Sequence, residues 1–152
     1  MANAIVRDAT EADLPRIVEL LAQLGLDEDR EDLSSPVAEG YRKAFREIEE
    51  DPRKSLLVVD VGGRVAGSAA VIIVPNLSHR GRPWAVVENV VVDEAERGKR
   101  YGELLMQRTR EIAEQAGCYK LTLTSNKDRA DAHRFYRRLG FIATHEGFRI
   151  GL

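Results

Sequence analysis

The segment spanning residues 90–105 constrains the fold of this chain more than any other part of the sequence. It begins as an apolar run typical of a buried strand and continues into a short acidic turn. A basic turn with glycines at positions 98 and 102 follows, and apolar residues at helical spacing start directly after it. A strand that runs through a tight turn into a helix favours a mixed α/β domain.

Hydrophobic periodicity predicts the other elements of the chain. Helices are expected over residues 14–24, 35–51, 101–116, and from 128 or 131 to 139. Strands are expected over residues 4–8, 55–60, 64–74, 84–92, 121–124, 141–144 and 148–150. Gly62-Gly63 predicts a short hairpin turn between the second and third strands, and residues 75–83 are expected to form a long connection.

Composition narrows the class of protein. The 152 residues, 43% hydrophobic and 32% charged, predict one globular domain over residues 1–152. A formal charge of −2 gives no basic footprint for nucleic acid, and no apolar run approaches the roughly 20 residues that cross a bilayer. The single cysteine, Cys118, and an N-terminus without a signal-peptide pattern predict a cytoplasmic location. No metal is expected, because no Cys, His and acidic residues have the spacing of a metal site.

The turn that contains Arg97, Gly98, Lys99 and Arg100 has the chemistry of an anion site. N–H groups at a helix N-terminus have no acceptor inside the helix and carry the positive end of its dipole. Glycine lets a phosphate approach the backbone closely, and the three basic side chains add charge. The turn is therefore expected to bind a phosphate or diphosphate. A tight strand-to-helix turn with solvated basic residues is the alternative that the same residues allow.

The run Arg97-Gly98-Lys99-Arg100-Tyr101-Gly102 resembles motif A of the GNAT superfamily, the acyl-CoA-dependent N-acyltransferases, whose signature is Arg/Gln-x-x-Gly-x-Gly/Ala. A second run, residues 132–141, resembles motif B of that family. Arg100 stands where the signature has its middle glycine, so its side chain must point away from the diphosphate or contact it. The resemblance implies an α/β three-layer fold. Its central, mostly antiparallel twisted sheet would have about seven strands, flanked by about four helices.

The resemblance also implies acetyl-CoA, or coenzyme A, as the cosubstrate. In that picture the backbone of Val90, Val91 and Val92 pairs with the pantetheine amides like an added strand, and the N–H groups of residues 97–102 hold the phosphates. Asn126 would bind the pantetheine or the carbonyl end. Its own context, between Ser125 and Lys127, is that of an ordinary turn residue.

Two residues are implied in catalysis. Tyr136 matches the family tyrosine that faces the CoA sulfur and acts as the general acid, and a core aromatic residue is the alternative. Glu88 is the implied general base, acting directly or through water. It lies within an apolar strand, where a carboxylate is costly unless it meets water, a partner or a ligand. Period-two alternation places Glu88 on one face with Val90 and Val92. A paired structural carboxylate is the other interpretation.

The acceptor is expected to be the primary amine of a small molecule, such as an amino sugar, an aminoalkylphosphonate or an aminoglycoside. Residues 117–120 resemble glucosamine-6-phosphate N-acetyltransferases, and residues 131–136 resemble aminoalkylphosphonate N-acetyltransferases. The basic loop 79–82 suits an anionic acceptor and the acidic run 27–32 a polycationic one, while solvated surface explains either. Protein or peptide N-acetylation and a non-catalytic acyl-CoA-binding regulatory domain stay open. A homodimer is expected by family analogy.

Overall fold

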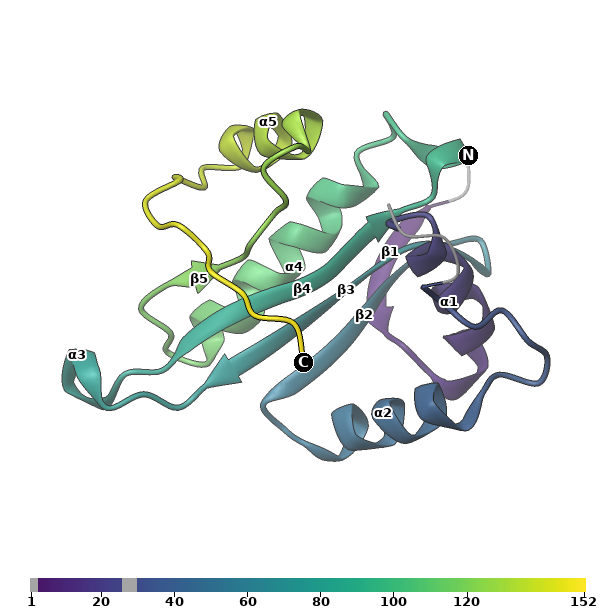
Figure 1. Cartoon of the computed structure of the whole chain (residues 1–152), viewed down its shortest axis with the longest axis horizontal. Coiled ribbons are helices and arrows are strands. Elements are labelled where there is room, and N and C mark those ends of the chain that lie inside the picture. The colour runs from purple at the N-terminus through teal and green to yellow at the C-terminus, as the bar shows by residue number, and fades with distance from the viewer. Residues whose placement is uncertain (1–2, 26–29) are drawn as a thin grey trace. The chain divides into compact units, whose positions relative to one another are not determined.

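A computed structural model describes residues 3–25 and 30–152 of the chain (Figure 1). The chain forms two compact units, Met1–Thr122 and Leu123–Leu152. The first unit contains β1 (Ala4–Asp8), α1 (Leu14–Ala22), α2 (Glu39–Glu50), β2 (Lys54–Val61), β3 (Arg64–Val74), α3 (Ser78–Gly81), β4 (Trp84–Val92), α4 (Tyr101–Gln115) and β5 (Leu121–Thr122), with short 3-10 helices η1 (Glu11–Asp13) and η2 (Glu94–Glu96). The second unit contains α5 (Ala130–Arg138).

The five strands form one sheet in the order β1-β2-β3-β4-β5. The first three pairings are antiparallel, and β4 pairs with β5 in parallel. Gly62 and Gly63 make the turn between β2 and β3 with φ angles of 61° and 88°, which confirms the predicted hairpin. The mixed α/β class and the mostly antiparallel sheet are confirmed as well.

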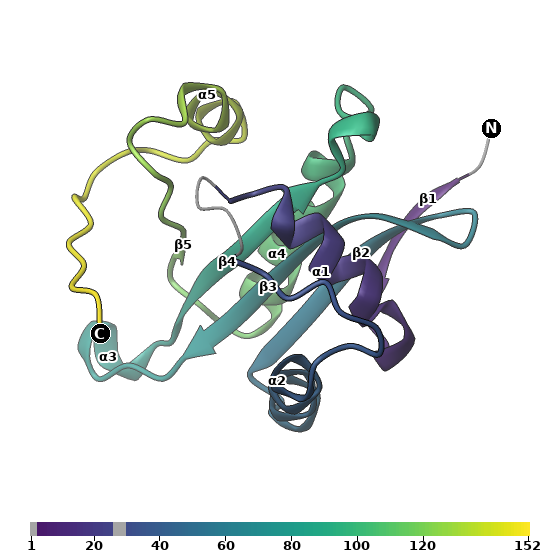
Figure 2. The same ribbon diagram turned by 45° about the vertical axis from the view of Figure 1, so that its right-hand side comes forward.

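Helices cover both faces of the sheet in the first unit (Figure 2). On one face, Ile17 and Leu20 of α1 pack into a buried cluster with Val91 of β4. On the other face, α4 approaches β3 so closely that a Cβ at Gly67 would lie 3.3 Å from Leu105 Cδ1 and 2.8 Å from the carbonyl oxygen of Val91. Glycine at position 67 therefore lets β3, β4 and α4 pack against one another, and the three layers are those expected.

The expectation of about seven strands is wrong for the described residues, which form five. Residues 141–144 and 148–150 alternate like strands but have no strand partner within residues 3–25 and 30–152, and the side chains of Ile142, Phe148 and Ile150 are exposed. Alternation gives a segment the propensity for a strand, whereas a strand in a sheet also needs a neighbour for its backbone groups. The fifth strand is shorter than expected and ends at Thr122.

The four expected helices are present among the described residues, and one begins later than expected. Helix α2 starts at Glu39 because Ala38 is still extended, with φ −57° and ψ 146°. The connection 75–83 contains the one-turn helix α3, in which His79 and Arg80 have positive φ angles. Of the acidic run 27–32, residues 27–29 lie outside the described residues, and Glu31 accepts a 2.8 Å hydrogen bond from Tyr41.

No helix in the described ranges combines the length and the apolar character needed to cross a bilayer.

Candidate active site

Strand β4 has one open edge along most of its length. It pairs with β3 from Trp84 to Val92, but with β5 only at Ala85 and Val86. From residue 87 to residue 92, the edge that faces away from β3 therefore has no strand partner among the described residues. Backbone N–H and C=O groups on such an edge can pair with an extended ligand as though it were an added strand.

The pairing of β3 with β4 contains a bulge. Ala70 lies opposite Glu88 and Ser68 lies opposite Val91, so that one residue of β3, Ala69, lies opposite two residues of β4, Asn89 and Val90. Asn89, the residue after Glu88, has a φ of 55°. Asparagine is one of the few residues besides glycine that adopts this conformation readily. The bulge thus falls at the polar pair in the middle of the strand.

The bulge overturns the expected side-chain alternation of β4. Paired residues of an antiparallel sheet share a face, so Glu88 lies on the face of Ser68 and Val91, the face that α1 covers. Val92 pairs with Gly67 on the opposite face, toward α4. The prediction that Glu88 shares a face with Val90 and Val92 is therefore wrong for Val92, because one extra residue breaks the period of two, while Val90 has no partner in β3 that tests its face.

Glu88 is exposed. Within the described ranges its carboxylate has neither an ion pair nor a hydrogen bond, so the interpretation as a paired structural carboxylate is wrong for these residues. An exposed carboxylate in mid-strand meets the solvent that its charge requires. The same exposure leaves it accessible to a ligand.

The turn between β4 and α4 exposes residues 97–100. Gly98 and Arg100 have φ angles of 83° and 66°, in the left-handed region. Arg100 is thus an arginine in a conformation that favours glycine, at the position where the family signature has its middle glycine. Its Nε donates a 2.6 Å hydrogen bond to Glu103, in the first turn of α4. Tyr101 and Gly102 begin the helix and are half-buried.

The buried carboxylate of Glu96 binds two basic side chains at this turn. It accepts hydrogen bonds from Lys99, at 2.5 Å, and from Arg64 at the start of β3. Hydrogen bonding from Lys99, reinforced by Arg64, holds the pKa of Glu96 below its usual value despite the opposing effect of burial. Of the three basic side chains predicted to contact phosphate, Lys99 and Arg100 are thus hydrogen-bonded within the protein. Arg97, by contrast, lies 3.8 Å from Glu94 and is two-thirds exposed.

The second unit carries Tyr136 on α5. Its ring is half-buried against Phe135 and Phe141, with ring centroids 5.2 and 5.9 Å away. Burial raises the pKa of the Tyr136 phenol above its usual value, and Arg129 opposes this in part. The hydroxyl therefore carries its proton at neutral pH. Gly140 follows the helix with a φ of 96°, as expected for a helix stop.

Asn126 of the same unit forms an ordinary turn. Its side-chain oxygen accepts a 2.9 Å hydrogen bond from the N–H of Asp128. Its carbonyl oxygen contacts the N–H of Arg129 at 3.1 Å and Nε2 of His133 at 2.8 Å. The side-chain NH2 of Asn126 donates to no group in the described part of the chain, so it stays available to a ligand.

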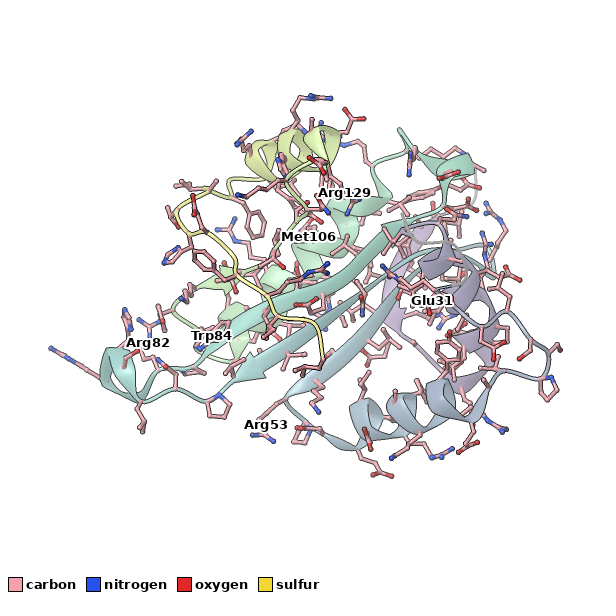
Figure 3. The ribbon with its side chains drawn as sticks, in the orientation of Figure 1. Glu31, Arg53, Arg82, Trp84, Met106 and Arg129 are labelled. Carbon is pink, nitrogen blue, oxygen red and sulfur yellow. The ribbon has the colours of Figure 1, made fainter. Side chains whose placement is uncertain are left out.

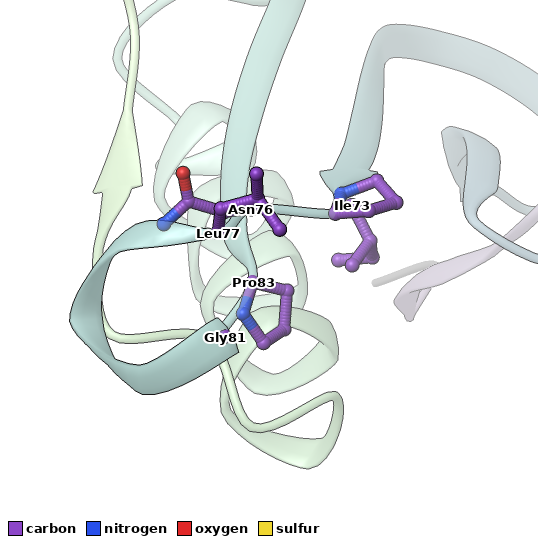
Figure 4. Close-up of a pocket in the computed structure, with 6 residues that line it drawn as sticks. Ile73, Asn76, Leu77, Gly81 and Pro83 are labelled. Atoms are coloured by element: carbon purple, nitrogen blue, oxygen red, sulfur yellow. The ribbon is translucent and has the colours of Figure 1, made fainter.

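The basic loop 79–82 lies at the start of β4, at the other end of this strand from residues 97–102. The His79 ring stacks on Tyr119 with centroids 3.8 Å apart, and Arg82 Nη2 donates to the carbonyl oxygen of Cys118 at 3.5 Å. Figure 3 shows Arg82 and Trp84 at this end of β4. A depression of about 440 Å³ next to the loop is lined mostly by apolar atoms, including those of Ile73 and Pro83 (Figure 4).

The predicted residues thus divide between the two units. The first unit holds Glu88, the three valines 90–92 and the turn 97–102, which follow one another along β4, η2 and α4. Asn126 and Tyr136 belong to the second unit. The described residues contain no group of three or more His, Cys, Asp or Glu side chains suited to a metal ion.

Sequence reasoning missed three residues around the turn. Asp93 accepts a hydrogen bond from the N–H of Ala95 and is also bound by Arg16 and Gln23 from α1. An Asp directly after a strand and before a short helix is a capping signal, which could have identified Asp93. The contacts with α1 are separated by 70 residues or more and have no local signature.

The sequence matches the acetyltransferase (GNAT) family over residues 22–141. It is 32% identical to glucosamine 6-phosphate N-acetyltransferase of Trypanosoma brucei brucei, covering 97% of this chain and 95% of that protein. It is 31% identical to aminoalkylphosphonate N-acetyltransferase of Salmonella typhimurium, covering 72% and 71%.

Solved structures match the fold over nearly the whole chain. A transcriptional regulator from Bacillus halodurans C-125 superposes with a TM-score of 0.94 at 37% identity, covering 99% of this chain and all of that one. A putative acetyltransferase from Agrobacterium tumefaciens str. C58 superposes with a TM-score of 0.87 at 32% identity, covering 97% and 99%. Members of the matched family use acetyl-CoA as a cosubstrate. The chain belongs to the GNAT family and is an acetyltransferase.

Proposed function

We propose that this protein transfers the acetyl group of acetyl-CoA directly to the primary amine of a small molecule. The observation that carries the proposal is the continuity of two backbone features. The open edge of β4, residues 87–92, leads through η2 into a turn with left-handed residues at 98 and 100 and then into the N-terminus of α4. An extended amide-containing chain followed by a diphosphate fits this order of groups.

The cosubstrate would lie along this track. The backbone of Val90, Val91 and Val92 would pair with the pantetheine amides, and the N–H groups from Gly98 to Gly102 would hold the diphosphate. Arg97 is the basic side chain of the turn with the weakest ion pair, and it would add its charge to the phosphates. Lys99 and Arg100 are paired with Glu96 and Glu103 and would act mainly by shaping the turn. Asn126 would donate its free NH2 to the pantetheine or the carbonyl end.

The reaction needs one base and one acid. An alkylamine with a pKa of about 10.4 is mostly protonated at neutral pH, so Glu88 would accept its proton, directly or through water. The amine nitrogen then bonds to the acetyl carbon, and the carbon–sulfur bond breaks. Tyr136 would give its proton to the departing thiolate, and the second proton that the nitrogen loses as the amide forms would return through water to the Tyr136 phenolate. The raised pKa of Tyr136 keeps its own proton in place before the transfer.

The acceptor class follows from the named relatives. Glucosamine 6-phosphate and an aminoalkylphosphonate each carry a primary amine and a phosphorus-containing anion, and the relatives named for them are 32% and 31% identical to this chain. We infer that the acceptor is a small amine of this kind. A panel that contains glucosamine 6-phosphate, 2-aminoethylphosphonate, an aminoglycoside and a lysine peptide tests the inference by release of free CoA thiol. The fastest release is expected with one of the two phosphorus-containing amines.

The same panel separates the competing functions. Fastest release with the peptide would indicate protein acetylation, and fastest release with the aminoglycoside would indicate a polycationic acceptor. A regulatory acyl-CoA-binding protein is favoured by one observation, the transcriptional regulator that is 37% identical to this chain. Tight CoA binding with no thiol release from any amine would support that function and contradict the enzymatic one.

Glu88→Gln tests the proposed base, with Glu49→Gln in α2 as a matched control, because both carboxylates are exposed and have no ion pair among the described residues. Loss of a general base is expected to lower kcat about 100-fold at neutral pH, and less at a pH where the free amine is abundant. The control is expected to keep the wild-type rate. Equal rates for the two variants at every pH would contradict the role of Glu88.

A further inference from the structure

Two polar side chains at helix α1 contact the residues that lead from β4 into the predicted diphosphate turn. Its apolar face, with Ile17 and Leu20, packs against the sheet next to Val91. This packing sets the flank of the helix beside residues 93 and 94, where β4 ends. Arg16 lies on that flank in the first turn of α1, and Gln23 is the C-cap residue directly after the helix.

Arg16 joins three groups around the end of β4. Its guanidinium binds the Asp93 carboxylate, donates to the carbonyl oxygen of Val65 at 3.2 Å, and pairs with Glu19 at 3.1 Å. Gln23 completes the arrangement: its NH2 lies 3.4 Å from Asp93, and its oxygen accepts the N–H of Glu94 at 3.0 Å. The first residues of the turn are thus held from α1.

Asp93 connects these contacts to the residues that follow it. Its carboxylate accepts the N–H of Ala95 at 3.1 Å, and its carbonyl oxygen accepts the N–H of Glu96 at 2.8 Å. Its own N–H donates to Ala66 of β3 at 2.8 Å. Hydrogen bonding from Ala95, with Gln23 and Arg16, holds the pKa of Asp93 below its usual value. Every polar group of Asp93, in the backbone and in the side chain, therefore has a partner. Asp93 lies four residues before Arg97.

We propose that Arg16 and Gln23 are positioning residues for the cosubstrate: acting through Asp93 and Glu94, they hold the turn 97–102 in the shape that binds the diphosphate. This inference rests on the proposed function of that turn. The described contacts of both side chains are with other groups of the protein. Their effect on the affinity for CoA would therefore be transmitted through the backbone of the turn. Backbone donors bind an anion well only when they point at one position together.

Arg7 provides a matched control for Arg16. The two side chains are about equally exposed, at 32% and 30%, and each bridges two carboxylates. Arg7 binds Asp13 at 2.7 Å and Asp60 at 2.9 Å, and thereby joins β1 and η1 to β2. Neither carboxylate belongs to the turn. Arg7→Met therefore reports what the loss of such a bridge does to the fold alone, and Arg16→Met adds the effect on the turn.

The test is the dissociation constant of CoA, measured by calorimetry on the full-length wild type and on both variants at a temperature where all are folded. Arg16→Met is expected to raise it about tenfold, and Arg7→Met less than about twofold. Gln23→Met, which leaves Arg16 in place, is expected to raise it about threefold. Arg16→Lys keeps the charge, so it is expected to bind CoA more tightly than Arg16→Met does. It is expected to bind CoA less tightly than the wild type, because an ammonium cannot bind Val65 and Asp93 together as the forked guanidinium does.

Kinetics with two acetyl donors separates positioning from a general loss of structure. With acetyl-CoA, Arg16→Met is expected to raise KM and leave kcat unchanged. With S-acetylpantetheine, which lacks the diphosphate, the variant and the wild type are expected to have equal kcat/KM. A dissociation constant for Arg16→Met no higher than that for Arg7→Met would overturn the inference while the proposed function stands. A wild type that does not bind CoA would overturn both.

Discussion

The guanidinium of Arg100 is hydrogen-bonded to Glu103 at 2.6 Å, within the first turn of α4, while the backbone of Arg100 is left-handed. The side chain is thus directed to its own helix and not to the other basic residues of the turn. The backbone at position 100 thus has the left-handed conformation that glycine adopts readily. The energetic cost of a left-handed arginine is of order 1–2 kcal/mol.

Arg100→Gly and Arg100→Val test this account of the turn. Both changes remove the ion pair with Glu103. Glycine relieves the left-handed strain but is more flexible when unfolded, so we expect its stability to stay within about 1 kcal/mol of the wild type. Valine is branched at Cβ and fits this region poorly, so we expect it to be less stable than the glycine variant by about 1–2 kcal/mol. Urea denaturation measures both, and equal stabilities would contradict a left-handed Arg100.

Gly67→Ala tests the close approach of β3, β4 and α4. A Cβ at this position would lie 2.8 Å from a carbonyl oxygen of β4, so strand and helix would have to move. A loss of about 1–3 kcal/mol in the free energy of unfolding is expected. Gly40→Ala in α2 is the control: its added Cβ has no neighbour within 4 Å, and alanine favours the helix. The packing argument fails if Gly67→Ala is as stable as this control.

Glu96→Gln tests the buried carboxylate beneath the turn. The pKa of Glu96 lies below its usual value in the folded protein, so its contribution to stability is present at neutral pH and is lost as the pH falls through the folded pKa. The variant is expected to have a lower denaturation midpoint than the wild type at pH 7. This difference is expected to shrink below about pH 4.3, where the glutamate of the unfolded chain takes up its proton while the folded one, with its lowered pKa, does so only at lower pH. A difference independent of pH would show that Glu96 does not act as a charged group.

Tyr136→Phe tests the proposed general acid. The hydroxyl makes no hydrogen bond within the described part of the chain, so its removal is expected to leave stability unchanged. We expect kcat to fall about 100-fold while the dissociation constant of CoA stays the same. Steady-state release of CoA thiol together with calorimetry measures both quantities. A variant with the wild-type kcat would leave Tyr136 as a core aromatic residue.

Local sequence signals predicted most of the fold. Strand β4 and helix α4 begin where the pattern placed them, at Trp84 and Tyr101, and α4 ends one residue earlier than expected. The hairpin at Gly62-Gly63 is correct because two residues that tolerate positive φ suffice to specify it. These features depend on neighbours in the sequence, which is why they could be predicted.

Features that depend on distant partners could not be predicted. The bulge next to Glu88 depends on the register between β4 and β3, and an Asn within a strand is not enough to predict it. Residues 148–150 have the alternation of a strand, but no described strand lies beside them. Arg16 has no local signal in the sequence that links it to Asp93, which lies 77 positions away and which it binds in the fold.

A crystal structure of the protein with coenzyme A would test the central claim most directly. The account predicts diphosphate oxygens within hydrogen-bond distance of the N–H groups of residues 97–102, and pantetheine beside the open edge of β4. A cofactor bound elsewhere, with the turn empty or filled by the guanidinium of Arg100, would contradict it.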